Sequence, residues 1–177
     1  MAYELLSREV KYRGRIFEFS IDQVCFQSGA TIQLDVIHHN GGAAVVALTD
    51  KQEVILVKQY RHPMGEYLLE LPAGKIEKEE TPEKTAAKEL IEETGFQADK
   101  LELLSITYPA PGYCSERLYI YLAKELRAVS SSPEFDEEIE VVVLPFSKAC
   151  EMIFSGEIQD AKTIIGLLAT ERKLKEK

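Results

Sequence analysis

A short helix predicted over residues 81–94 constrains this chain more than any other feature, because the sequence marks both of its ends. Thr81 is a suitable N-cap, and Pro82 fits the first helical position, where its missing N–H costs no hydrogen bond. Glu83 complements the positive end of the helix dipole, and Gly95 can adopt the left-handed conformation that ends many helices. The fold must therefore accommodate a helix of defined length at this point.

Three glutamates share one face of this predicted helix. Glu89, Glu92 and Glu93 lie three and four residues apart, so their side chains leave the helix together. Like charges at this spacing destabilise an isolated helix by about 0.2–0.5 kcal/mol per pair, whereas a bound divalent cation with oxygen ligands, such as Mg²⁺, would reverse the sign. The alternative is a solvated face on which Lys84 and Lys88 pair with the glutamates, and the helix pattern alone favours that alternative.

The rest of the chain shows both strand and helix patterns, which predicts an α/β fold of the α+β type with a mixed sheet. Strands are expected in seven segments: 17–22, 31–35, 43–48, 54–57, 101–107, 117–123 and 139–144. Two further helices are expected, one over 147–154 and one opened by Asp160. The apolar stripe expected on the last helix consists of Ile164, Ile165, Leu167 and Leu168.

A domain boundary is expected near residue 40, where alternating strand patterns give way to continuous apolar runs. Residues 1–40 are predicted to form a small N-terminal antiparallel β unit, and residues 41–177 the main domain. The loops over 109–116 and 129–138 are unusually long, and long loops often carry functional residues.

Charge and hydropathy argue against several classes of protein. Asp and Glu number 30 against 21 Lys and Arg, a formal net charge of -9, and no basic cluster is present, so nucleic acid is not an expected partner. No apolar run is long enough to span a membrane, and the N-terminal segment lacks the apolar stretch of a signal peptide, so we expect a cytoplasmic protein. Cys25, Cys114 and Cys150 are far apart and form no CxxC pair, which argues against a disulfide framework or a zinc site.

The sequence before the helix favours the metal-site interpretation over a solvated face. From Gly74 to Phe96 it follows the spacing G-x5-E-x7-K-E-L-x-E-E-x-G-F, with Glu80 as its first glutamate. This pattern resembles the Nudix box, the long and specific signature of the Nudix hydrolase superfamily. One position departs, because Lys88 stands where the family has arginine. Lysine keeps the charge but loses the planar fork, so a less rigidly held site is expected.

The resemblance implies a Nudix fold, in which a mixed β-sheet lies between helices, and a metal site for hydrolysis of a pyrophosphate. By the matching positions, Glu89 and Glu93 are direct metal ligands, and Glu92 belongs to the same cluster. The backbone carbonyl of Ala73 is a further ligand, and Glu92 and Glu93 take part in catalysis. Mg²⁺ is the expected ion, with Mn²⁺ as a substitute. Such ions neutralise phosphate charge and activate water.

The segments on either side of the box resemble the ADP-ribose pyrophosphatase subfamily. Gln59-Tyr60-Arg61, the run from Glu70 to Gly74, and Pro111, fifteen residues after the box, match its pattern. The resemblance implies that four residues bind substrate: Arg61, Glu70, Pro111 and Glu116. Each has an ordinary alternative: a surface pair for Arg61, a rim charge for Glu70, a plain turn at Pro111, and a pair between Glu116 and Arg117.

The acidic loop over 133–140 is similar to the loop that supplies the subfamily's general base. Glu137 is the first choice for that base, with Glu134, Asp136 and Glu138 as alternatives. Without the box, this loop would be interpreted as a solvated acidic loop.

The expected function is Mg²⁺-dependent hydrolysis of ADP-ribose, or of a related nucleoside diphosphate sugar, to AMP and ribose 5-phosphate. The resemblance also implies a homodimer in which the N-terminal unit crosses to the partner and completes an adenine pocket. Because the chain has no tryptophan, we expect Ile16, Phe17 or Leu34 to supply the apolar or aromatic surface that contacts adenine. The alternatives are a Nudix pyrophosphatase of another nucleotide and a non-catalytic domain that senses ADP-ribose.

Overall fold

The computed structural model describes residues 3–130 and 138–176 of the chain. The chain divides into two compact units, one of Met1–Gly41 with Tyr108–Arg117 and the other of Gly42–Thr107 with Leu118–Lys177. The first unit therefore includes a loop that lies within the range expected for the main domain.

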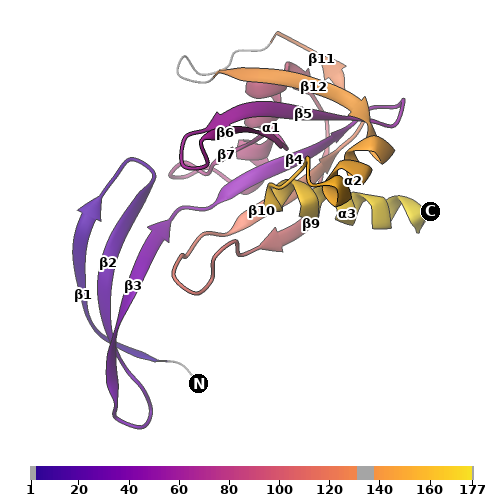
Figure 1. The fold of residues 1–177 in the computed structure, drawn as a ribbon. Coiled ribbons are helices and arrows are strands. Elements are labelled where there is room, and N and C mark those ends of the chain that lie inside the picture. The colour runs from indigo at the N-terminus through magenta and orange to yellow at the C-terminus, as the bar shows by residue number, and fades with distance from the viewer. Residues whose placement is uncertain (1–2, 131–137, 177) are drawn as a thin grey trace. The chain divides into compact units, whose positions relative to one another are not determined.

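The first unit is a three-stranded antiparallel sheet of β1 (Glu4–Arg13), β2 (Phe17–Cys25) and β3 (Thr31–His39), in that order (Figure 1). The predicted β2–β3 hairpin is confirmed. Strand β1 was not expected, because the pairing of β1 with β2 shifts register between Leu5 and Ser7 and between Val10 and Tyr12. Such irregularities disrupt the alternation of apolar and polar residues by which a strand is recognised in a sequence.

The loop over residues 108–117 is held against β3 by backbone hydrogen bonds. The Ile37 N–H donates to the Tyr113 carbonyl oxygen at 2.7 Å, and the Ser115 N–H donates to the Ile37 carbonyl oxygen at 2.9 Å. This long loop is therefore an ordered part of the first unit.

The second unit contains a seven-stranded mixed sheet with helices on both faces (Figure 1). Its main order is β12-β5-β4-β10-β9, with β6 paired to β5 and β7 paired to β4. Only the pairing of β4 with β10 is parallel. The strands of this sheet are β4 (Gly42–Leu48), β5 (Glu53–Arg61), β6 (Glu66–Glu70), β7 (Ala73–Lys75), β9 (Leu101–Thr107), β10 (Leu118–Ala123) and β12 (Ile139–Pro145). The short strands β8 (Phe96–Gln97) and β11 (Arg127–Ala128) pair separately.

Helices α1 (Pro82–Thr94), α2 (Phe146–Ser155) and α3 (Ala161–Lys175) cover this sheet. Strand β4 is buried throughout, since α1 packs on one face and α2 and α3 on the other. Val45 belongs to the cluster of Leu90 in α1, and Val46 to the cluster of Leu167 in α3. Burial on both faces explains why β4 is a continuous apolar run. The predicted α+β fold, with a mixed sheet between helices and an antiparallel N-terminal sheet, is confirmed.

The ends of α1 lie where the sequence predicts them, but the buried face of α3 differs from the predicted one. The Thr81 hydroxyl caps α1 by accepting from the Lys84 N–H at 3.3 Å, and Gly95 ends the helix with φ +72°. In α3, however, Leu167 is fully buried whereas Leu168 is 37% exposed, so the predicted four-residue stripe is wrong at Leu168. In the part of the chain that the structure describes, no helix is long and apolar enough to cross a membrane.

Candidate active site

The glycine and a glutamate of the box motif lie in direct contact. Strand β7 pairs with β4 and places Gly74 opposite Ala43. Ala43 belongs to the hydrophobic cluster that packs against α1. A Cβ atom added at Gly74 would lie 2.0 Å from Oε1 of Glu89 and 2.2 Å from its Cδ. Such distances are far inside van der Waals contact. Any residue with a Cβ at this position would therefore force the Glu89 side chain to move away from β7.

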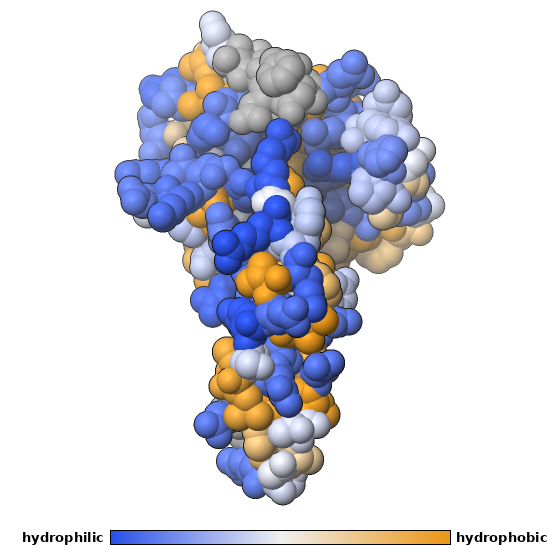
Figure 2. Space-filling model, turned by 90° about the vertical axis from the view of Figure 1, so that its left-hand side faces the viewer, coloured by the Kyte–Doolittle hydropathy of each residue, from blue (hydrophilic) through white to orange (hydrophobic). Residues whose placement is uncertain are grey.

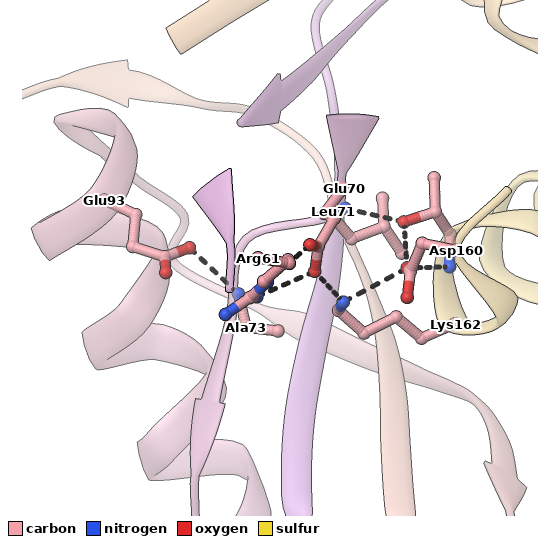
Figure 3. A network of polar contacts seen from close by, with 8 residues as sticks. Arg61, Glu70, Leu71, Ala73, Glu93, Asp160 and Lys162 are labelled. Carbon is pink, nitrogen blue, oxygen red and sulfur yellow. Dashed lines mark hydrogen bonds and ion pairs between the residues drawn. The ribbon is translucent and has the colours of Figure 1, made fainter. Parts of the chain in front are cut away.

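Glu93 joins α1 to β7 through the backbone. Its Oε2 accepts a hydrogen bond from the Ala73 N–H at 2.9 Å, and the residue is only 4% exposed (Figure 3). This contact brings the predicted ligands Glu93 and Ala73 together. The Gly74–Glu89 contact lies at the next position of β7, so two predicted carboxylate ligands meet adjacent residues of one strand.

Lys88 supports the glutamate cluster from the solvent side of α1. Its Nζ lies 3.3 Å from Oε2 of Glu92, one helical turn away. Burial by itself lowers the pKa of Lys88, but the hydrogen bond to Glu92 and the negative charges of Glu92, Glu89 and Glu80 raise it above its usual value. The lysine thus remains charged and holds one of the three glutamates of the cluster.

Glu80 fixes the loop before α1. Its Oε2 accepts a hydrogen bond from the hydroxyl of Thr85 at 2.9 Å, and Thr85 is buried in the first turns of the helix. The first glutamate of the box therefore ties the loop to the first turns of α1.

The ligand chemistry of this region fits a divalent metal ion. Glu89, Glu93 and the carbonyl of Ala73 offer hard oxygen donors, which Mg²⁺ and similar ions prefer. The Glu89 carboxylate lies against the backbone of Gly74, the residue after Ala73. Among residues 3–130 and 138–176, no three His, Cys, Asp or Glu side chains are already arranged as a metal site. Carboxylates repel one another at short range, so these glutamate side chains are expected to come together around an ion only when a cation is bound.

Arg61 and Glu70 form a bidentate ion pair beside these ligands. Arg61 Nε lies 2.6 Å from Glu70 Oε1, and Arg61 Nη2 lies 2.8 Å from Glu70 Oε2 (Figure 3). Burial alone raises the pKa of Glu70, but Arg61 and Lys162 together hold it below its usual value. The Glu70 side chain is only 2% exposed, whereas that of Arg61 is 39% exposed. Of the two, Arg61 is the group that can reach a ligand.

Helix α3 supplies residues that the sequence analysis did not assign to the site. Lys162 Nζ forms an ion pair with Oε2 of Glu70 and lies 3.1 Å from Oδ2 of Asp160. The Thr163 hydroxyl accepts a hydrogen bond from the Leu71 N–H at 2.8 Å and donates to Oδ2 of Asp160 at 2.6 Å. Asp160 was expected only as an N-cap, and no local pattern points to Lys162, which is 92 residues from Glu70.

Two predicted substrate residues, Pro111 and Glu116, belong to the first unit. Glu116 Oε1 lies 3.8 Å from Nδ1 of His39, and Arg117 lies over the ring of Tyr108, with its Cζ 5.7 Å from the ring centroid. Glu116 therefore faces β3 of its own unit. The predicted general base Glu137 lies outside the described residues.

The second unit thus combines a mixed sheet, helices on both faces and a glycine-loop-helix segment that carries the glutamates. These features define a class of protein, and the family description "NUDIX domain" matches residues 38–165. The chain belongs to the Nudix family, and the resemblance seen in the sequence is confirmed. Nudix hydrolases generally need divalent metal ions.

Individual relatives are similar over most of the chain. It is 36% identical over 160 residues to the ADP-ribose pyrophosphatase of Bacillus subtilis (strain 168), which covers 89% of this chain and 86% of that protein. It is 33% identical over 176 residues to the methanol dehydrogenase activator of Bacillus methanolicus, covering 97% and 95%. A crystal structure of an ADP compounds hydrolase aligns with a TM-score of 0.89 at 24% identity, over 99% of this chain and 96% of that one, which shows the shared fold.

Proposed function

We propose that this chain hydrolyses the pyrophosphate of ADP-ribose, or of a related nucleoside diphosphate sugar, with Mg²⁺ as the cofactor. Water adds to one phosphorus atom, the bridging P–O bond breaks, and AMP and ribose 5-phosphate are the products. The observation that carries the proposal is the meeting of Glu89 and Glu93 with Gly74 and Ala73 on β7. The relative with ADP-ribose pyrophosphatase activity supports the choice of substrate.

The ion would be held by Glu89, Glu93, Glu92 and the carbonyl of Ala73, with Mn²⁺ as a substitute for Mg²⁺. When bound, it supplies charge neutralisation for the pyrophosphate and a lowered pKa for the attacking water. The chain contributes the fixed geometry, because Glu93 anchors the Ala73 backbone and Lys88 restrains Glu92.

The remaining site residues bind the substrate, position a binding residue or activate the attacking water. Arg61 binds phosphate through the exposed part of its guanidinium group, and Glu70 holds Arg61 in place from below. Pro111 and Glu116 are the other two residues that we assign to substrate binding. Glu137 deprotonates or orients the attacking water.

The functional molecule is a cytoplasmic homodimer in which the first unit completes the adenine pocket of the partner. The first unit contains a cavity of about 420 Å³, lined in part by Ile16 and Phe17. Ile16 is 50% exposed and Phe17 39% exposed, so both offer apolar surface to a base. Leu34, the third candidate for the pocket wall, is not among the residues that line this cavity.

Release of AMP from ADP-ribose in the presence of Mg²⁺ tests the proposal directly. We expect wild-type activity that a chelator abolishes and Mg²⁺ restores, and a loss of roughly a hundredfold or more in kcat for Glu93→Gln, which removes a charged metal ligand. Binding of ADP-ribose without AMP release would instead indicate a sensor. An active wild type with an unaffected Glu93→Gln variant would contradict the metal assignment.

A second candidate follows from the relative described as a methanol dehydrogenase activator, which aligns with 97% of this chain. On this proposal the same site acts to stimulate a dehydrogenase. The rate of methanol oxidation by a purified methanol dehydrogenase, with and without this chain, decides it. An increase that is lost in Glu93→Gln would support the candidate, and an unchanged rate would remove it.

A further inference from the structure

Four charged side chains of alternating sign lie in sequence beside the proposed metal ligands. Arg61 pairs with Glu70, Glu70 also pairs with Lys162, and Lys162 also pairs with Asp160 (Figure 3). They come from the ends of β5 and β6 and from the start of α3. Two cations and two anions sum to zero, so the group as a whole does not repel an anionic ligand.

Glu70 is the centre of this group, and its buried carboxylate already accepts three hydrogen bonds. Both of its oxygens accept hydrogen bonds from Arg61, and Oε2 also contacts Lys162. The side chains of Glu70 and Lys162 are 2% and 13% exposed, so solvent screens their charges weakly. If the charge of Lys162 were removed, the three remaining charges would sum to minus one, next to the guanidinium group that is proposed to bind phosphate.

We infer that Lys162 is a positioning residue for phosphate binding, which acts through Glu70 to keep Arg61 oriented and effectively cationic toward the substrate. The inference rests on the proposed function, since it names how the same site holds the pyrophosphate. Lys162 itself does not touch the substrate.

The first turn of α3 makes a second contact that also holds the segment around Glu70 in place. Thr163 accepts the Leu71 N–H, one residue after Glu70, and the Ala73 N–H binds Glu93 of α1 two residues later. The segment from Glu70 to Ala73 is therefore held by α3 at its start and by α1 at its end. A change at Lys162 therefore disturbs the segment that carries Glu70, which positions Arg61 for phosphate. The same segment carries Ala73, a proposed metal ligand.

A purely structural ion pair is the alternative, because breaking a buried pair lowers stability whatever the function of the residues. Steady-state kinetics separate the two explanations. A structural lysine lowers the amount of folded enzyme and leaves the KM of the folded fraction unchanged, whereas a positioning lysine changes KM.

The experiment measures kcat, KM and thermal unfolding for Lys162→Met with ADP-ribose and Mg²⁺. We expect KM to rise about tenfold with kcat reduced less than about threefold, as when binding shared by ground state and transition state is lost. Lys162→Arg should restore most of the affinity. The matched control is Lys173→Met, which removes another ion-paired lysine of α3, bound to Glu102, and should leave KM unchanged.

Two further variants keep the test decisive. In an Arg61→Met background, Lys162→Met should raise KM little further, because the effect passes through Arg61. If Lys162→Met does not fold, Lys162→Gln removes the charge while keeping a hydrogen-bond donor, and the same rise in KM is expected.

An active wild type with an unchanged KM in the folded Lys162 variants would overturn the inference and leave the proposed function intact. A rise of the same size in both backgrounds would also overturn it. A wild type that releases no AMP would refute the proposed function and the inference together.

Discussion

At the scale of single residues, the site depends on Gly74 because of the space that it leaves. A Cβ at this position would come within 2.0 Å of a Glu89 carboxylate oxygen, so any other residue requires the Glu89 side chain to move away from β7. The sequence pattern marks this glycine as part of the box but does not state the reason. The structure supplies it as close contact between a strand and a helical side chain.

Gly74→Ala should therefore displace the Glu89 carboxylate and reduce activity. We expect a loss of about a hundredfold in kcat, the scale of losing one ligand of an electrostatic site, and a destabilisation of about 1–3 kcal/mol from overpacking. AMP release and thermal unfolding measure the two effects.

Glu89→Ala provides the matched background for this test, because it removes all three of the atoms nearest to the added Cβ. In that background, Gly74→Ala should cost almost no stability. A stability loss of the same size in both backgrounds would show that the strain arises elsewhere.

At the scale of elements, α3 shows how packing selects among residues that look equivalent in the sequence. Leu167 and Leu168 are neighbours of the same type, and both were assigned to the apolar stripe. Tight packing of α3 on the sheet decides between them, since a Cβ at Gly166 would lie 2.7 Å from Leu71 Cδ1 and 2.9 Å from Val46 Cγ2. The helix thus presents the face of Gly166 and Leu167 to the core and leaves Leu168 at the edge.

The two leucines should differ clearly when each is shortened to alanine. Leu167→Ala creates a cavity in a fully buried position and should cost about 2–5 kcal/mol, whereas Leu168→Ala should cost about 1 kcal/mol or less. Urea unfolding of the two variants at equal protein concentration measures the difference. Equal losses would mean that the face assigned to α3 is incorrect.

At the scale of the whole molecule, the first unit carries several large apolar side chains that are exposed. Figure 2 shows hydrophobic residues, in orange, among the hydrophilic residues of this unit. Leu5, Val24 and Ile32 lie opposite one another across the three strands; Leu5 is 50% and Ile32 39% exposed, whereas Val24 between them is 6% exposed. Exposed apolar side chains that lie close together on one face of a sheet often mark an interface between proteins.

The proposed homodimer would cover this surface. We expect light scattering to give twice the chain mass of 20.0 kDa, and the double variant Leu5→Asp with Ile32→Asp to shift the population toward the single-chain mass. Circular dichroism of the variant checks that the sheet still forms. A wild type that has only the single-chain mass at micromolar concentration would contradict the dimer.

Much of the fold follows from local pattern. The capped helix, the buried strand β4 and the starts of β2, β3 and β5 appear where the sequence predicts them, because periodicity and turn residues act over a few positions; β2, β3 and β5 run three to four residues beyond the predicted segments. The short strands β6 and β7 were not predicted, since five and three residues carry too little pattern. Their pairing is nevertheless what brings Glu70 and Ala73 to the site.

The sequence by itself determined the family, the carboxylate helix and the identity of its glutamates, because each depends on spacing along one short segment. Only the tertiary structure decided that Glu70 is buried between Arg61 and Lys162, and that Glu93 holds the Ala73 backbone. These contacts join residues up to 92 positions apart, and they exist because α1 and α3 pack on opposite faces of one sheet. The spacing of residues along the chain does not predict these long-range contacts. They form because the helices and the sheet pack as layers.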